Sequence, residues 1–258
     1  IQLKDSTVRY ALAADGYYRL LEACPFCDVT PTETTVATAD AKLLAPVMPR
    51  QIVAIGLNYR AHAAEGGAAL PDAPVVFIKT PNAVTNPNDP IVLPRMAPAE
   101  VDYECELAIV IGKTTKNVSE EDALTHVLGY TCANDVSARD CQLRLDRQWA
   151  RGKCFDTFAP LGPWIETEVD GDCLGIRSVL NGEVMQDSNT SDLIFSCRFL
   201  VSYISRCMTL YPGSIIMTGT PAGVGFARTP PRFLREGDTI SVEIKGIGTL
   251  TNPVVSES

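Results

Sequence analysis

The segment Asp102–Ile111, DYECELAIVI, constrains the fold more than any other part of the chain. Successive side chains of a strand point to opposite faces, and from Leu107 onward both faces of this segment are apolar. Such a strand belongs in a sheet that is covered on both sides. The acids Asp102, Glu104 and Glu106 share one face at its start, so we expect the strand to bring them to the mouth of a cavity.

Carboxylates on one strand face repel one another unless positive charge lies between them. One interpretation is a solvated strand end, where acids are common. The other is a cation site, and hard carboxylate oxygens suit Mg²⁺, Mn²⁺ or Ca²⁺ rather than Zn²⁺, which prefers His and Cys. Because the strand that follows these acids is apolar on both faces, we favour the cation site.

Composition limits the classes of function. The 258 residues, 46% of them hydrophobic, suffice for one domain with a substantial core, or for one domain with a small appendage. The net charge of −9 opposes binding to nucleic acids and to anionic membranes. No apolar run approaches roughly 18 residues, and no basic segment followed by an apolar one opens the chain, so we expect no membrane association.

The nine cysteines lack the regular spacing of a disulfide framework, which favours a reducing compartment. We expect the cytoplasm, with an organellar matrix as the alternative. Cys24 and Cys27 have the CxxC spacing of a redox dithiol, but no clear strand precedes them and no clear helix follows. A loop with two free thiols is therefore the default interpretation of this pair.

Short apolar runs separated by Gly and Pro predict a chain rich in β structure. Residues 1–48 read as a small β-rich N-terminal extension, which Pro46 and Pro49 end, and residues 49–258 read as the main domain. Strands are expected at residues 51–56, 74–79, 91–93, 106–111, 213–218 and 238–244. They do not alternate regularly with helices, so we predict an α+β fold with a mixed sheet folded on itself.

Two helices are expected. Residues Ser119–Leu128 open with a Ser cap followed by acids and stop at Gly129, which is typical of a helix. A second helix is expected after Asp192, where apolar residues form one stripe. Both helices are predicted to be structural elements rather than parts of a site.

His62 and Glu65 lie three residues apart in NYRAHAAEGG, on one face of a predicted helical turn that Gly66 and Gly67 break. A carboxylate beside an imidazole orients the ring and favours its protonated form, as a general base needs. A surface turn with a chance HxxE is the alternative. The two glycines would also allow a lid that closes over a substrate.

Three later segments supply further polar groups. Asp135 follows an apolar run and is expected at the end of another strand, where it either caps a turn or closes the cation site. Lys153 lies among aromatic and turn-forming residues, and is either a surface lysine or an active-site cation. Residues 218–225, TGTPAGVG, fit no phosphate-binding motif, so their N–H groups and the Thr220 hydroxyl are expected to approach a small carboxylate.

The chain resembles the catalytic domain of the fumarylacetoacetate hydrolase superfamily in the order of six segments: GLNYRAHAAE, FIKTPNAV, DYECELAIVIGK, NDVSARDCQ, RGKCFDTFAPLGP and TGTPAGVG. The resemblance covers about residues 50–250. It implies a mixed β-sandwich roll with few helices, usually a homodimer, that binds one divalent cation, expected to be Mg²⁺. The implied metal ligands are Glu104, Glu106 and Asp135.

The same resemblance implies roles for other residues. His62 and Glu65 match the water-activating dyad, and Lys153 matches the active-site lysine. The implied substrate-binding residues are Arg139, Gln142 and Thr220. Lys79 falls in the F-x-K-P segment of the family, where Thr80 replaces the usual proline, so the resemblance gives Lys79 no firm role.

The function implied is metal-dependent hydrolysis of a C–C bond in a β-diketo acid of the acylpyruvate or fumarylpyruvate type. The 2-oxo carboxylate end of the substrate would chelate the cation, and His62 would activate a water. Cleavage would then release an enolate near Lys153. Decarboxylation of an oxaloacetate-like acid is the alternative, nearly as well supported, and isomerisation of a 2-oxo diacid ranks below both. Outside enzymes, the alternative is a metal-stabilised binding protein.

Overall fold

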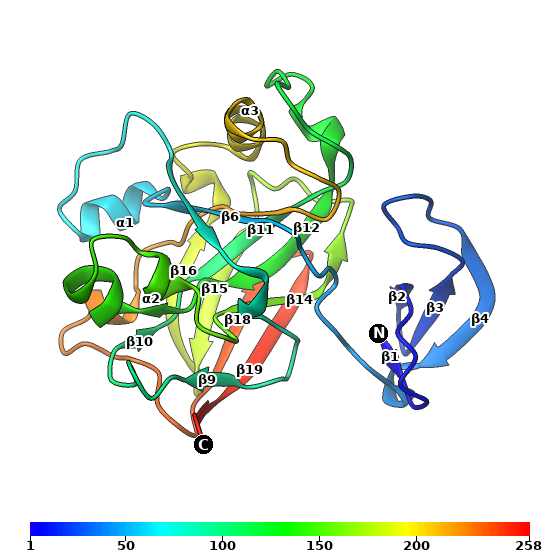
Figure 1. Ribbon diagram of the computed structural model, residues 1–258, viewed down its shortest axis with the longest axis horizontal. Helices are drawn as coiled ribbons and strands as arrows, with labels where there is room; N and C mark the ends of the chain where they lie inside the picture. Colours follow the sequence, from blue (N-terminus) through cyan, green and yellow to red (C-terminus); the bar gives the residue numbers. More distant parts are fainter.

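Strand β11 (Cys105–Ile111) lies within a seven-stranded mixed sheet of the main body (Figure 1). Its side chains alternate between two hydrophobic clusters. Ala108 and Val110 pack into one cluster, whereas Leu107 and Ile109 pack into the other. Every residue of β11 is buried, so the prediction of a strand covered on both faces is confirmed.

Two sheets form the main body of the computed structural model, which describes residues 1–258. The first contains β11 together with β6 (Ile52–Gly56), β7 (Val75–Lys79), β8 (Val84–Thr85), β12 (Val127–Asn134), β14 (Ala159–Glu166) and β17 (Ile215–Met217). The second consists of β9 (Ile91–Leu93), β15 (Gly175–Leu180), β16 (Glu183–Asn189), β18 (Thr239–Ile244) and β19 (Gly248–Ser256). Their strand orders are β7-β6-β17-β11-β12-β14-β8 and β16-β15-β18-β19-β9.

The two sheets pack against each other. Leu107 of β11 shares a hydrophobic cluster with Ile176 of β15 and Val242 of β18. Each sheet is mixed, since β6 pairs parallel to β17 and β9 parallel to β19, whereas most other neighbours are antiparallel. With few helices, this is the α+β fold that the sequence predicts. None of the helices has the length and apolar character that crossing a membrane requires.

The N-terminal residues form a small unit beside the main body (Figure 1, dark blue). Its strands are β1 (Gln2–Leu3), β2 (Ala11–Ala14), β3 (Tyr17–Leu21), β4 (Pro31–Ala37) and β5 (Ala41–Lys42). β2, β3 and β4 form an antiparallel sheet, and β1 pairs with β5. Lys42 contacts Asp89 of the main body at 2.7 Å. The unit contributes no side chain to the site described below.

The α-helices are α1 (Arg60–Glu65), α2 (Ala150–Lys153) and α3 (Cys197–Cys207), and a π-helical turn spans Cys141–Leu145. α1 confirms the helical turn predicted around His62 and Glu65. α3 confirms the helix predicted after Asp192, and it starts after Ser196, whose hydroxyl accepts the N–H of Phe199 at 3.4 Å.

The helix predicted over Ser119–Leu128 is wrong. Only a short 3₁₀ turn forms, at Ala123–His126, and Val127 already begins β12. Gly129 does not stop a helix but lies inside this strand, where a Cβ atom would come 2.4 Å from the carbonyl oxygen of Glu166. The glycine is needed because β14 passes too close for any side chain, a constraint that local sequence does not reveal.

Candidate active site

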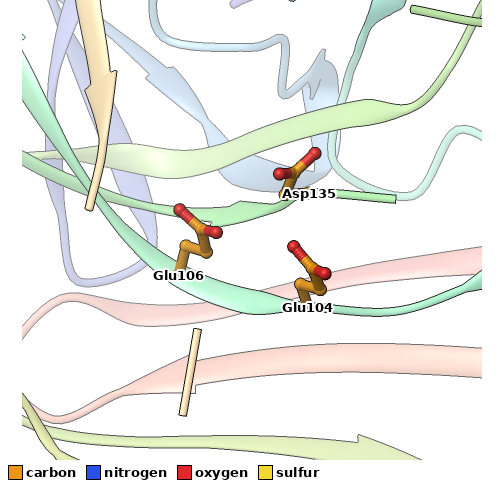
Figure 2. Close-up of side chains that lie close together, drawn as sticks. All are labelled: Glu104, Glu106 and Asp135. Carbon is orange, nitrogen blue, oxygen red and sulfur yellow. The ribbon is translucent and has the colours of Figure 1, made fainter. Parts of the chain in front are cut away.

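The carboxylates of Glu104, Glu106 and Asp135 point toward one another (Figure 2). Glu106 lies on β11, Glu104 directly before that strand and Asp135 directly after β12. β11 and β12 are antiparallel, with Glu106 opposite Ala133. Asp135, the residue after β12, therefore lies beside Glu104, whose carbonyl accepts its N–H at 2.9 Å. One oxygen of each carboxylate lies within 4.8 Å of the others, and all three residues are buried.

Three cationic side chains contact these acids. Lys153, at the end of α2, contacts Glu104 (Nζ–Oε2, 2.9 Å) and Asp135 (Nζ–Oδ2, 2.7 Å). Lys79, at the end of β7, contacts Asp135 (Nζ–Oδ1, 2.6 Å). Arg139 contacts Glu104 (Nη1–Oε1, 2.7 Å). Each of the two lysines is only 1% exposed, which excludes the surface-lysine interpretation of Lys153.

Glu104 and Glu106 differ in their electrostatic surroundings. Burial opposes the charge of Glu104, but Lys153 and Arg139 outweigh burial and lower the pKa of its carboxyl. Burial and the two neighbouring carboxylates raise the pKa of Glu106 well above its usual value. No cation contacts Glu106, and its hydrogen-bond donor is the N–H of Gly219 at 2.8 Å. Of the acids in the cluster, Glu106 is therefore the one whose ionised form an added cation would stabilise most.

The charges of the cluster favour a divalent ion. Besides the three acids, Asp102 is buried against Arg139 (Oδ2–Nε, 2.9 Å). Four buried carboxylates thus face three buried cations, so one negative charge is unbalanced when all are ionised. Oxygen donors at this spacing fit a hard cation, which Glu104, Glu106 and Asp135 would hold. A divalent ion would convert the single negative charge into a single positive one.

We expect the affinity for Mg²⁺ to rise with pH. A metal ligand must be deprotonated, and the raised pKa of Glu106 means that this carboxyl keeps its proton to a higher pH than a free one. The affinity should rise by up to about tenfold per pH unit, the slope for release of one proton. Titration calorimetry of metal-free protein in buffers of different ionisation enthalpy measures the affinity for Mg²⁺ and the number of protons released on binding. An affinity that is constant between pH 5 and pH 8, with no proton released, would contradict the expectation.

His62 and Glu65, the predicted dyad, lie on α1. His62 Nδ1 is 3.0 Å from Glu65 Oε2, and the two side chains are 14% and 24% exposed. Glu65 also accepts the N–H of Gly223 at 2.9 Å, which ties α1 to the loop after β17. A protonated His62 would add to the effect of Lys153 and Arg139 in lowering the pKa of Glu104. With Nδ1 facing Glu65, Nε2 remains free to exchange a proton with water or a substrate.

The loop after β17, residues 218–226, holds three acids through its main chain. The N–H groups of Gly219, Gly223 and Gly225 donate to carboxylates at 2.7–2.9 Å. The acceptors are Glu106, Glu65 and Asp102, respectively. Gly219 has φ +99°, and a Cβ atom there would lie 2.8 Å from Asn58 Cβ, so no other residue fits. These N–H groups bind carboxylates of the protein itself, whereas the sequence predicts a carboxylate of a ligand.

The predicted substrate-binding residues lie around the acids. Arg139 Nη1 donates to Gln142 at 2.8 Å, and Arg139 Nη2 has no hydrogen-bond partner although the residue is only 3% exposed. The Thr220 hydroxyl donates to the carbonyl of Cys105 at 3.0 Å and accepts from Gln186 Nε2 at 2.7 Å. Thr220 is thus fixed by the protein, with one lone pair of its hydroxyl oxygen left for a further donor.

Sequence reasoning missed the contribution of two residues. Lys79 ends an apolar strand and is buried against Asp135, and a lysine that closes the run VVFI is the signal that could have marked it. Gln186 is 1% exposed and links Thr220 with the N–H of Cys105. No local signal marks Gln186, because its partners come from β11, from β15 and from the loop after β17.

Comparisons with sequence profiles and with related proteins all point to one family. The sequence profile described as "Fumarylacetoacetate (FAA) hydrolase C-terminal" matches residues 51–255, and that described as "Rv2993c-like, N-terminal" matches residues 2–46. The chain is 51% identical over 228 residues to fumarylacetoacetate hydrolase domain-containing protein 2 homolog of Dictyostelium discoideum, covering 83% of this chain and 74% of that protein. It is 46% identical over 225 residues to oxaloacetate tautomerase fahd2, mitochondrial, of Xenopus laevis, covering 85% and 70%.

A solved structure agrees with the sequence comparisons. The crystal structure of 5-carboxymethyl-2-hydroxymuconate delta-isomerase from Mycobacterium smegmatis matches with a TM-score of 0.87 and 44% sequence identity. The match covers 99% of this chain and 97% of that chain. The profile match over residues 51–255 and these similarities lead to one conclusion: the chain belongs to the fumarylacetoacetate hydrolase family.

Proposed function

We propose that the protein catalyses proton transfer on a 2-oxo diacid of the oxaloacetate type, between the 2-oxygen and the adjacent carbon, so that enol and keto forms interconvert. Mg²⁺ is the proposed cofactor, with Mn²⁺ or Ca²⁺ as alternatives. Relatives named oxaloacetate tautomerase and delta-isomerase favour this enol chemistry, which the sequence analysis ranks below hydrolysis.

The charge balance of the buried cluster is the observation that carries the proposal. A divalent ion on Glu104, Glu106 and Asp135 leaves one positive charge uncompensated, which favours an anionic ligand. Arg139 Nη2 is a buried donor without a partner, and such a donor is stabilised by an acceptor on the ligand. A 2-oxo acid supplies the carboxylate that both features require.

The side chains of the site have distinct proposed roles. A bound divalent ion would polarise the 2-oxo group and make the adjacent C–H more acidic. His62 Nε2 would accept that proton and return it to oxygen, with Glu65 holding the ring and stabilising its charge. Lys153 would stabilise negative charge that develops on the substrate oxygen. Arg139, Gln142 and Thr220 would orient the substrate.

Hydrolytic cleavage of an acylpyruvate is a second candidate, and the exposure of the dyad favours it. His62 and Glu65 are 14% and 24% exposed, so water reaches the proposed base. A water deprotonated by His62 could attack the distal carbonyl, and the C–C bond would break to give a carboxylic acid and the enolate of pyruvate. Decarboxylation of oxaloacetate would release CO₂ and the same enolate.

One panel of assays separates these reactions. Loss of the enol absorbance of oxaloacetate measures tautomerisation, and pyruvate formation from oxaloacetate and from acylpyruvates measures decarboxylation and hydrolysis. Each assay is run with Mg²⁺, with Mn²⁺ and with a chelator. Metal-dependent decay of the enol without pyruvate supports our proposal. Pyruvate from an acylpyruvate would establish the hydrolase instead, and tight binding without turnover of any 2-oxo acid would favour a metal-stabilised binding protein.

We expect His62→Ala to lower kcat by about 10²–10⁴-fold, the usual contribution of a general acid–base group. The affinity for metal should stay within about threefold, because His62 is not one of the oxygen ligands. His126→Ala is the matched control, since it is the only other histidine and contacts Thr115 at 3.1 Å outside the cluster. Equal kcat for wild type and His62→Ala would remove His62 from the mechanism.

A further inference from the structure

Asp102 lies at the end of β10 (Val101–Asp102), which pairs with β13 (Ser137–Ala138), and its side chain is completely buried. Its Oδ1 accepts the N–H groups of Tyr103 at 2.8 Å and Gly225 at 2.7 Å. Its Oδ2 accepts the N–H of Phe226 at 3.0 Å and Arg139 Nε at 2.9 Å. Four donors fill the acceptor sites of this carboxylate, so it is not available as a metal ligand.

Arg139 is shared between two acids with different tasks. Its Nη1 contacts Glu104, a proposed metal ligand, at 2.7 Å, whereas its Nε contacts Asp102. The ring of Phe226 lies 4.5 Å from the guanidinium carbon and covers one face of the group. A metal ion on Glu104 would compete with Arg139 for that carboxylate, whereas Asp102 is not one of the proposed metal ligands. The contact with Asp102 therefore holds Arg139 independently of Glu104.

Gly225 allows the side chain of Asp102 to contact the loop of residues 218–226. A Cβ atom at position 225 would lie 2.5 Å from Asp102 Oδ1 and 2.1 Å from the carbonyl oxygen of Arg232. Only glycine allows the close approach by which Asp102 accepts two successive N–H groups of the loop. Asp102 thus fixes the guanidinium of Arg139 and the segment that carries Phe226 in one arrangement.

We propose that Asp102 is a positioning residue for substrate binding, which holds Arg139 so that its unpartnered Nη2 is available to a carboxylate of the substrate. This inference rests on the proposed function, because it requires an anionic 2-oxo acid as substrate. Asp102 acts through Arg139 and is not one of the proposed metal ligands, since four protein donors fill its acceptor sites.

Asp102→Asn tests the inference, because the amide keeps the shape of the side chain but lacks its charge. The NH₂ group of Asn would also face N–H donors that an amide nitrogen cannot accept. We expect KM for the 2-oxo acid to rise about 10- to 100-fold, as for a lost hydrogen bond to a charged group. The kcat value should change by less than about threefold, and Mg²⁺ should still bind, because neither the dyad nor the proposed metal ligands are altered. A merely structural role would instead lower the fraction of active protein and leave KM unchanged.

A double-mutant cycle adds a second readout. Arg139→Met should raise KM, and Asp102→Asn combined with it should raise KM no further, since Asp102 acts through Arg139. Arg139→Lys, which keeps the charge but not the fork of donors, should also raise KM and covers the case that Asp102→Asn does not fold. Multiplying effects in the cycle, an unchanged KM in Arg139→Lys, or lost Mg²⁺ binding in Asp102→Asn would overturn the inference. A wild type without turnover of any 2-oxo acid would refute the proposed function itself.

Discussion

Replacing Glu106 with Gln is expected to lower kcat/KM by about 10³-fold while making the metal-free protein more stable. The loss of activity follows because a metal ion supplies several kcal/mol of charge stabilisation, and each 1.36 kcal/mol is tenfold in rate. The gain in stability follows because Glu106 has no cationic partner, whereas Gln still accepts the N–H of Gly219. Gln can also donate to the neighbouring carboxylates.

The sign of the pH dependence makes this prediction sharper. The pKa of Glu106 is raised in the folded state, so its contribution to stability is fully present below the pKa of the unfolded chain and is lost as the pH rises through the folded pKa. The Glu106→Gln variant has no carboxyl at this position, so it does not lose this stability as the pH rises. Its advantage in melting temperature over metal-free wild type should therefore grow as the pH rises and vanish in acid.

Glu104→Gln is the matched control for Glu106→Gln. It also removes a proposed metal ligand, but it takes a partner from Lys153 and Arg139, so the metal-free protein should become less stable. Calorimetric titration with Mg²⁺ and thermal unfolding with chelator measure both properties. A Glu106→Gln variant that binds Mg²⁺ as wild type does, or that melts below metal-free wild type at neutral pH, would contradict the assignment.

Lys153→Met should lower the free energy of unfolding of the metal-free protein by about 3 kcal/mol, the lower end for breaking a buried ion pair. The lower end applies because Glu104 keeps Arg139 and Asp135 keeps Lys79 as partners. A divalent ion supplies the missing positive charge, so Mg²⁺ should stabilise this variant more than it stabilises wild type. Denaturant titrations with Mg²⁺ and with chelator give both differences.

Lys42→Met is the control for Lys153→Met. Lys42 forms a surface ion pair with Asp89 at 2.7 Å and is 48% exposed, so its loss should change stability by less than about 1 kcal/mol. Mg²⁺ should stabilise this control as much as wild type. If Lys153→Met behaved like Lys42→Met, the lysine would not serve as a counterion of the acids.

The sequence predicts the central strand and the face that carries Glu104 and Glu106, because alternation along one strand is a local property. It predicts Asp135 only as the end of another strand, since the partner of that strand depends on pairing across the sheet. The helix expected before Gly129 fails for a related reason: the close approach of β14 decides the structure there. Lys79 and Gln186 gain their roles only from contacts between distant segments.

The loop of residues 218–226 has a consequence for how this family can diversify. It holds Glu106, Glu65 and Asp102 with N–H groups, which every residue except proline possesses. The glycines are fixed by geometry, whereas side chains such as Phe226, 38% exposed, are not needed to hold the acids. We therefore expect that substitutions at such positions change the proposed substrate pocket while the acids stay in place.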